Sequence, residues 1–125
     1  MNVQNIGIDL VEITKIKKIG LQFLATRILS FQEKRIFLTL QNNERKLTFL
    51  GGRWAAKEAL FKAFRTQANL NYTKSNYRDW SILNDCNNAP YLEDKNWKNQ
   101  VLLSISHTTN YALAMVLILQ KKKKN

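Results

Sequence analysis

The chain is poor in cysteine and has no long apolar run, and each shortage excludes a class of protein. Cys86 is the only cysteine among 125 residues, so an intrachain disulfide framework is excluded, and no Cys/His cluster could bind structural zinc. The longest apolar run, Tyr111–Leu119, is far shorter than the roughly 20 residues that a membrane-spanning helix needs. The first residues lack the basic-then-apolar pattern of a secretion signal. We therefore expect a reduced, cytoplasmic protein without membrane insertion.

Apolar side chains, by contrast, are present in sufficient number for a packed core. Hydrophobic residues make up 45% of the chain and aromatic residues 10%, which excludes global disorder. A chain of this length suits one domain. No repeat or linker interrupts the sequence. We predict a single domain over residues 1–120 and a disordered, lysine-rich tail at residues 121–125.

Acidic residues are scarce. Lys and Arg number 20 against 9 Asp and Glu, which gives a formal net charge of +11. The four lysines of the tail account for part of it, and the rest of the chain carries +7. A basic balance favours an anionic partner, which could be a nucleic acid, a phosphorylated small molecule or an acidic protein. Charge alone does not choose among these three.

The opening residues alternate as the residues of a β-strand do. Over residues 3–10, Ile6, Ile8 and Leu10 lie on one face and Asp9 on the other. Asp9 thus stands where a strand ends and a helical pattern begins. Two roles are open to it, namely a helix N-cap or a functional carboxylate.

The rest of the chain is helical first and extended later, which predicts an α+β fold with helices packed on a mostly antiparallel sheet. Ser30 followed by Glu33 is typical of a capping box at a helix start. Gly51 and Gly52, inside the longest helical stretch, indicate the close approach of another backbone or a ligand. The predicted helices cover residues 11–24, 31–40 and 45–64, and the predicted strands cover residues 80–83, 89–92, 101–106 and 111–119, with a loop at 107–110 between the last two.

One stripe of the longest predicted helix combines charged and aromatic side chains. Trp54, Glu58 and Lys62 are spaced i, i+4, i+8, and Phe61 lies beside them. A Glu–Lys ion pair on a solvated face is one interpretation. A pocket wall is the other, because a solvated face seldom carries aromatic residues.

The only histidine, His107, follows an apolar strand and is surrounded by serine and threonine residues. Hydroxyl and backbone donors of this kind are the groups that bind phosphate. A lone histidine is more often structural or merely exposed. The residue types needed for a Ser/His/Asp triad are present, but no nucleophile-elbow motif accompanies them, and the glycine-rich phosphate-binding motifs are absent.

Three blocks of residues together resemble the holo-acyl-carrier-protein synthase family, the short phosphopantetheinyl transferases. They are residues 6–9 (IGID), 49–64 (FLGGRWAAKEALFKAF) and 104–108 (SISHT), in the order and at about the spacing of that family. The resemblance covers nearly the whole chain apart from the lysine tail. It implies the fold of these transferases, a homotrimer with active sites at the subunit boundaries, and a place in fatty acid biosynthesis.

The resemblance also implies a reaction and the residues that perform it. Such enzymes transfer the 4′-phosphopantetheine arm of coenzyme A to a serine of apo acyl carrier protein, release adenosine 3′,5′-bisphosphate and use Mg²⁺. Asp9 and Glu58 would be the metal ligands, and Lys62 would contact the substrate phosphates. Lys57 belongs to the same signature but points in a different direction on the helix, so we expect a supporting role for it. The general base stays open between a metal-bound water and Glu58 acting through one. The residues implied in coenzyme A binding are Arg53, Lys62, Pro90, His107 and Thr108.

Acyl carrier proteins are acidic, so the basic residues of the first predicted helix and just beyond it become candidates for docking the carrier. The alternative is an ordinary solvated face. The candidate docking residues are Lys15, Lys17, Lys18 and Arg27.

Two rival classes are less well supported. An RNA-binding protein would show aromatic residues interleaved with Lys and Arg on its strands, and this pattern is missing, so we expect no nucleic-acid partner. A trimeric interaction module without activity is opposed by the intact Asp9, Glu58 and Lys62.

Overall fold

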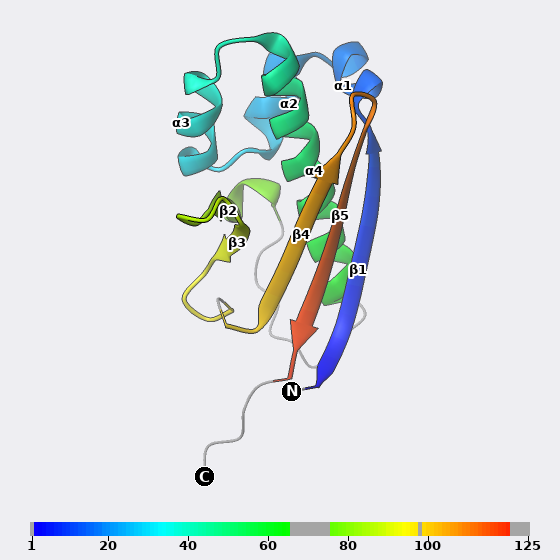
Figure 1. The fold of residues 1–125 in the computed structure, drawn as a ribbon, viewed down its shortest axis with the longest axis vertical. Coiled ribbons are helices and arrows are strands. Elements are labelled where there is room, and N and C mark those ends of the chain that lie inside the picture. The colour runs from blue at the N-terminus through cyan, green and yellow to red at the C-terminus, as the bar shows by residue number, and fades with distance from the viewer. Residues whose placement is uncertain (1, 66–75, 98, 121–125) are drawn as a thin grey trace.

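The strands form two antiparallel sheets in the computed structural model, which describes residues 2–65, 76–97 and 99–120 (Figure 1). The larger sheet has the strand order β1-β5-β4, and the smaller one pairs β2 with β3. The predicted tail at 121–125 lies outside the described residues. The strands are β1 (Val3–Glu12), β2 (Ser81–Asn84), β3 (Pro90–Glu93), β4 (Val101–His107) and β5 (Tyr111–Leu119).

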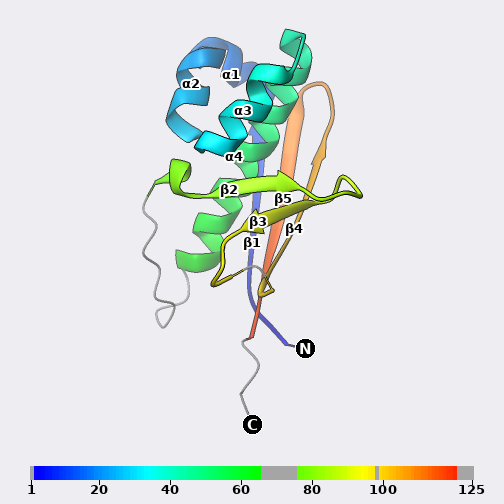
Figure 2. The same cartoon turned by 90° about the vertical axis from the view of Figure 1, so that its left-hand side faces the viewer.

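Helices pack on one face of the larger sheet, so the predicted α+β fold is confirmed. The longest helix, α4, runs along the sheet, while the three short helices gather at one end of it (Figures 1 and 2). The helices are α1 (Ile13–Ile19), α2 (Leu21–Ile28), α3 (Phe31–Thr39) and α4 (Asn43–Arg65), and a 3₁₀ turn, η1 (Tyr77–Asp79), precedes β2.

The first predicted helix is wrong in its extent, because residues 11–24 do not form one helix. Val11 and Glu12 still belong to β1, and Gly20 separates α1 from α2. The φ of Gly20 is 110°, a left-handed value that favours glycine, and its N–H closes α1 by donating to the carbonyl of Ile16 at 2.8 Å. The break divides the candidate docking residues, leaving Arg27 on α2 and the three lysines on α1.

The capping box at α3 is confirmed. The Glu33 N–H donates to Ser30 Oγ at 3.2 Å, and the Ser30 N–H donates to Glu33 Oε1 at 2.8 Å. The Glu33 side chain is wholly buried, which is unusual for a capping glutamate. Its carboxylate also accepts from the Ile82 N–H at 2.8 Å, so it links the start of α3 to β2.

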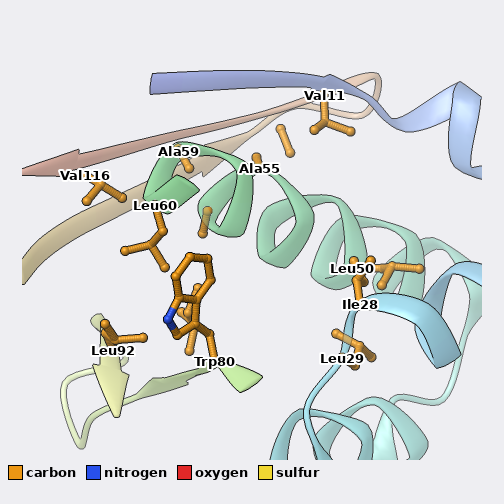
Figure 3. Close-up of a cluster of buried hydrophobic side chains, with 14 of the residues drawn as sticks. Val11, Ile28, Leu29, Leu50, Ala55, Ala59, Leu60, Trp80, Leu92 and Val116 are labelled. Atoms are coloured by element: carbon orange, nitrogen blue, oxygen red, sulfur yellow. The ribbon is translucent and has the colours of Figure 1, made fainter. Parts of the chain in front are cut away.

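Small residues let α4 lie very close to the sheet. A Cβ added to Gly7 of β1 would stand 2.0 Å from the carbonyl oxygen of Ala59, and one added to Gly52 would stand 3.1 Å from the Ile105 side chain. At Gly51 and Gly52 the nearest atoms belong to side chains, Ile13 and Ile105, so the approach of another backbone or a ligand predicted there is wrong, and the backbone approach lies at Gly7 instead. Figure 3 shows Ala55 and Ala59 on the sheet side of α4, while Leu60 points toward Trp80 and Leu92 on the other side.

The alternation predicted for β1 is confirmed, but its apolar face points away from α4. Ile6, Ile8 and Leu10 are 54%, 52% and 61% exposed, whereas Gly7, Asp9 and Val11 occupy the helix side. The glycine is what allows this, since only the small side of β1 can approach the helix backbone so closely. The same outer face carries exposed apolar residues from the neighbouring strands, Leu102, Leu113 and Met115.

Candidate functional site

The carboxylate of Asp9 lies at the edge strand of the larger sheet, beside α4. Lys62 Nζ donates to Asp9 Oδ1 at 2.9 Å and to the backbone carbonyl of Ile8 at 3.0 Å. The N-cap of α1 is Glu12, which makes no side-chain capping bond, so the N-cap interpretation of Asp9 is wrong. The Lys62 side chain is still 45% exposed, and its ammonium can therefore meet a second anion.

Glu58 lies one turn before Lys62 on α4 and is half-buried. The Tyr77 hydroxyl donates to Glu58 Oε1 at 2.5 Å. Burial raises the pKa of Tyr77 well above its usual range, the carboxylates of Glu58 and Asp9 raise it further, and a hydrogen bond with Trp54 opposes the change. The charges of Asp9 and Glu58 thus both act on the Tyr77 hydroxyl, although only Glu58 accepts a hydrogen bond from it.

These contacts bear on the first of the two interpretations of the helix stripe, the Glu58–Lys62 ion pair. Among the described residues, Lys62 pairs with Asp9 and not with Glu58, so the interpretation as an ion pair within the helix is wrong. Glu58 instead faces Tyr77, whose ring packs edge-to-face on Phe61 with the centroids 5.0 Å apart. Glu58 and Lys62 thus make their contacts with η1 and β1, and the pocket-wall interpretation stays a prediction.

The donor set of this site suits Mg²⁺ only if a substrate completes it. Within the described ranges, no group of three or more His, Cys, Asp and Glu side chains could hold a metal ion. Mg²⁺ is commonly held by one or two carboxylates, with substrate phosphates and waters in the remaining positions. Asp9 and Glu58 fit a Mg²⁺ site of this kind, in which the protein supplies two carboxylates and the substrate supplies the phosphates.

Lys57 precedes Glu58 but points into the protein, where it is completely buried. Its ammonium donates to Glu33, to the carbonyl of Ile28 at 2.6 Å and to the carbonyl of Tyr77 at 2.9 Å. These three bonds use all three ammonium hydrogens. Burial lowers the pKa of Lys57, and the neighbouring Glu33 opposes the change. Lys57 thus supports the site from inside and has no donor left for a ligand.

Arg53 and His107 line a hollow of about 480 Å³ at the β4 edge of the sheet, which we call the Arg53 hollow. Arg53 is 6% exposed, and its Nε donates to the carbonyl of Ile82 at 3.1 Å. A further guanidinium nitrogen donates to Asn84 Oδ1 at 3.2 Å. Burial lowers the pKa of Arg53, and Glu33 opposes this. Arg45 lines the same hollow and was missed, because nothing in its spacing distinguishes it from other surface arginines.

Thr108 and Pro90 do not lie in the Arg53 hollow. Thr108 and His107 line a separate hollow of about 390 Å³, and Thr108 Oγ1 accepts from the Tyr111 N–H at 3.1 Å. Pro90 begins β3, opposite Asn84. His107 is the last residue of β4, so the predicted loop at 107–110 is one residue shorter.

The predicted site residues thus form two groups on opposite edges of the larger sheet. Asp9, Glu58 and Lys62 gather at the β1 edge. His107 belongs to the β4 edge, and the whole of β5 lies between the two edge strands. Within one chain the structure does not bring the two groups together.

The candidate docking residues are all exposed, and they are accompanied by apolar side chains. Ile19 is 43% exposed and Phe23 is 56% exposed. The Arg27 guanidinium lies 5.0 Å from the centre of the Phe23 ring. This mixed apolar and basic surface was not predicted, because the helical spacing placed Ile19 and Phe23 on the same stripe as the buried Ile16. The docking residues on α1 are Lys15, Lys17 and Lys18.

Across the part of the chain that the structure describes, no helix combines the length and apolar character needed to cross a membrane.

Comparison with known proteins gives consistent matches. The family model of the 4′-phosphopantetheinyl transferase superfamily matches residues 5–116. The holo-[acyl-carrier-protein] synthase of Onion yellows phytoplasma is 56% identical over 119 residues, covering 93% of this chain and 94% of the relative, and that of Acholeplasma laidlawii is 41% identical over 117 residues, covering 93% and 96%. The crystal structure of a Bacillus anthracis holo-(acyl-carrier-protein) synthase in complex with CoA (3′,5′-ADP) has a TM-score of 0.77 and 33% identity, covering 93% of this chain and 96% of that one.

Proposed function

This chain belongs to the 4′-phosphopantetheinyl transferase superfamily, among the holo-[acyl-carrier-protein] synthases, and from that premise we propose its reaction. The enzyme transfers the 4′-phosphopantetheine group of coenzyme A to a serine of apo acyl carrier protein and releases adenosine 3′,5′-bisphosphate, in a Mg²⁺-dependent manner. The observation that carries the proposal is the group of polar side chains at the β1 edge, where Asp9 pairs with the exposed ammonium of Lys62 and the half-buried Glu58 lies one helical turn before Lys62.

The proposed reaction requires no covalent bond between the protein and the transferred group. Displacement at a diphosphate mainly requires positioning and neutralisation of developing charge. Bound Mg²⁺, held by Asp9 and Glu58, would supply Lewis-acid neutralisation of the diphosphate oxygens. Lys62 donates one ammonium hydrogen to Asp9, and its exposed side is available to bind a substrate phosphate.

The hollow at the β4 edge supports a role in holding the nucleotide half of coenzyme A. Arg53 and His107 both line it, and Arg45 adds a further positive charge. His107 and Thr108 extend this site to the adjacent hollow, with Pro90 on the neighbouring hairpin. Since Arg53 is engaged by Ile82 and Asn84, it contributes mainly its charge.

The separation of the two groups supports a homotrimer in which the β1 edge of one copy completes the site at the β4 edge of the next. A head-to-tail arrangement of this kind closes into a ring. The exposed apolar outer face of the sheet, around Ile8 and Met115, supplies a surface that a single chain leaves uncovered. This face is apolar and carries no basic stripe, which also disfavours a nucleic-acid partner.

Light scattering tests the assembly. We expect a particle of three times 14.6 kDa for the wild type. Met115→Lys places a charge in the middle of the apolar face, so it should yield single chains with little transfer, because each site then lacks its second half. A wild-type protein that is fully active as a monomer would contradict the shared site.

Mass spectrometry tests the reaction. The protein is incubated with apo acyl carrier protein, coenzyme A and Mg²⁺, and we expect the carrier to gain the mass of one phosphopantetheine group. A carrier whose acceptor serine is replaced by alanine serves as the control and should gain nothing. If the unmodified apo carrier also gains nothing, the proposed reaction is wrong.

The basic residues of α1 should receive the acidic carrier protein. Rim charges chiefly steer the encounter of oppositely charged partners, and salt screens them beyond a Debye length of roughly 8 Å. We therefore expect the double variant Lys15→Glu/Lys18→Glu to raise the KM for the carrier about tenfold, as two reversed rim charges would. The KM for coenzyme A should stay unchanged, because neither lysine lines the hollow of Arg53 or the hollow of Thr108.

Initial rates against carrier concentration at low and high salt measure this effect. The matched control is Arg35→Glu/Lys95→Glu, which reverses two exposed charges away from α1. The control should behave as the wild type at the same salt concentration apart from a small general charge effect. Equal KM values and equal salt dependence for both double variants would mean that the carrier docks elsewhere.

A further inference from the structure

We propose that Tyr77 is a positioning residue of the transferase site, whose hydroxyl orients the Glu58 carboxylate while Lys57 fixes Tyr77 for this task. The inference rests on the proposed role of Glu58 as a metal ligand. Tyr77 lies in η1, outside the three sequence blocks that pointed to the site.

Tyr77 is held at both ends by consecutive residues of α4. Its hydroxyl donates to Glu58 Oε1 at 2.5 Å, and its backbone carbonyl accepts from Lys57 Nζ at 2.9 Å. Its ring packs edge-to-face on Phe61, one turn along the same helix, with an interplanar angle of 89°. Three contacts from one helix therefore determine where the hydroxyl lies relative to Glu58.

The support behind Tyr77 is rigid. Lys57 is anchored in the core by Glu33 and by the Ile28 carbonyl, so its ammonium has a single position. Immediately after η1, Trp80 is 2% exposed, and its ring lies 4.6 Å from that of Phe61. The 3₁₀ turn is thus tied to α4 at the tyrosine itself and at Trp80, the residue that follows the turn.

Glu58 needs such a support more than Asp9 does. Its side chain has three rotatable bonds and is only half-buried, and among the described residues no lysine or arginine pairs with it. Asp9 has a shorter side chain and is held by Lys62. Each carboxylate therefore has one side-chain donor on Oδ1 or Oε1, which restrains its orientation. Hydrogen bonds that orient a ligating carboxylate typically matter about 10- to 100-fold for metal affinity or activity.

Tyr77→Phe isolates the hydroxyl, because phenylalanine keeps the ring that packs on Phe61. We expect the dissociation constant for Mn²⁺ to rise about tenfold, the lower end of the range for such orienting contacts. Melting temperature should change little. In the transfer assay, the KM for Mg²⁺ should rise while kcat at saturating Mg²⁺ stays near the wild-type value, a split that general destabilisation would not produce.

The binding measurement does not depend on turnover. MnCl₂ is titrated into the full chain with coenzyme A present, the free ion is followed by electron paramagnetic resonance, and a titration of coenzyme A alone is subtracted. Tyr91→Phe removes a hydroxyl from a half-buried tyrosine of β3 and serves as the matched control, with wild-type affinity expected. Asp9→Asn and Glu58→Gln report whether the ion binds at the proposed site.

The outcomes distinguish the positioning role of Tyr77 from the proposed metal site of Asp9 and Glu58. Wild-type binding that is lost in Asp9→Asn and Glu58→Gln and weakened in Tyr77→Phe supports the positioning role. Binding that is lost in the two carboxylate variants but unchanged in Tyr77→Phe overturns the positioning role and leaves the proposed function standing. Binding that is insensitive to all three substitutions overturns the metal assignment, and the positioning role with it.

Discussion

Asp9→Asn and Glu58→Gln are each expected to reduce transfer of phosphopantetheine about a thousandfold, which corresponds to about 4 kcal/mol of transition-state stabilisation supplied by a bound metal. Each change replaces a carboxylate by a neutral amide of the same shape. Neither residue belongs to the apolar core, and neither side chain is completely buried. The loss should therefore appear in the rate and not in the fold.

The rate of mass gain by the apo carrier measures the effect, and circular dichroism confirms that the variants are folded. Glu12→Gln is the matched control, since Glu12 is an exposed carboxylate three residues after Asp9 on the same strand. It should retain the wild-type rate. If Asp9→Asn and Glu58→Gln both retain near-normal transfer in the presence of EDTA, the metal assignment is wrong.

The sequence predicted most of the elements because their signals are local. The capping box of Ser30 and Glu33 acts within one helical turn, and α4 was predicted to within two residues at its start. The antiparallel hairpin of β4 and β5 followed from two apolar stretches separated by polar residues. The break at Gly20 was missed, since an apolar period of helical spacing continues across it and only the backbone dihedral reveals the turn.

The direction in which an apolar face points was not predictable from alternation alone. The alternation of Ile6, Ile8 and Leu10 states only that they share a side of β1. Which side meets α4 is decided by Gly7, where any Cβ would collide with the backbone of the helix. Recognising this requires knowledge of the partner across the contact, and a partner far away in the sequence leaves no local signal.

The residues of the candidate site also differ in whether the sequence carries a local signal for them. Asp9, Glu58 and Lys62 were found because they belong to motif blocks, and the structure adds that Lys62 pairs with Asp9 rather than with Glu58. Tyr77 was missed, as it lies in a polar connecting stretch with no periodic pattern. Its role depends on contacts with residues about 20 positions earlier in the chain.

Lys57→Met should be the most destabilising of the substitutions considered, because Lys57 is the buried counter-charge of Glu33. Both side chains are wholly buried and paired with each other. Removing one partner of a buried ion pair leaves an unpaired charge in the core and typically costs about 3–5 kcal/mol. The lysine also holds the carbonyls of Ile28 and Tyr77, which would lose a donor.

A double-mutant cycle distinguishes the charge from the packing. Glu33→Gln removes the negative charge and keeps one of the two acceptor oxygens, so it can accept from the Ser30 N–H or from the Ile82 N–H but not from both. The double variant Lys57→Met/Glu33→Gln should therefore be more stable than Lys57→Met alone, by about 1–3 kcal/mol, since no unpaired charge remains in the core. Urea denaturation of the four proteins gives the free energies of unfolding. A cost below about 1 kcal/mol for Lys57→Met, or a double variant no more stable than that single one, would show that the pair is not what holds α3, α4 and η1 together.

Transfer by the double variant should stay low even where it is folded, because Tyr77 loses its anchor on α4 and the carboxylate of Glu58 loses the hydroxyl that orients it.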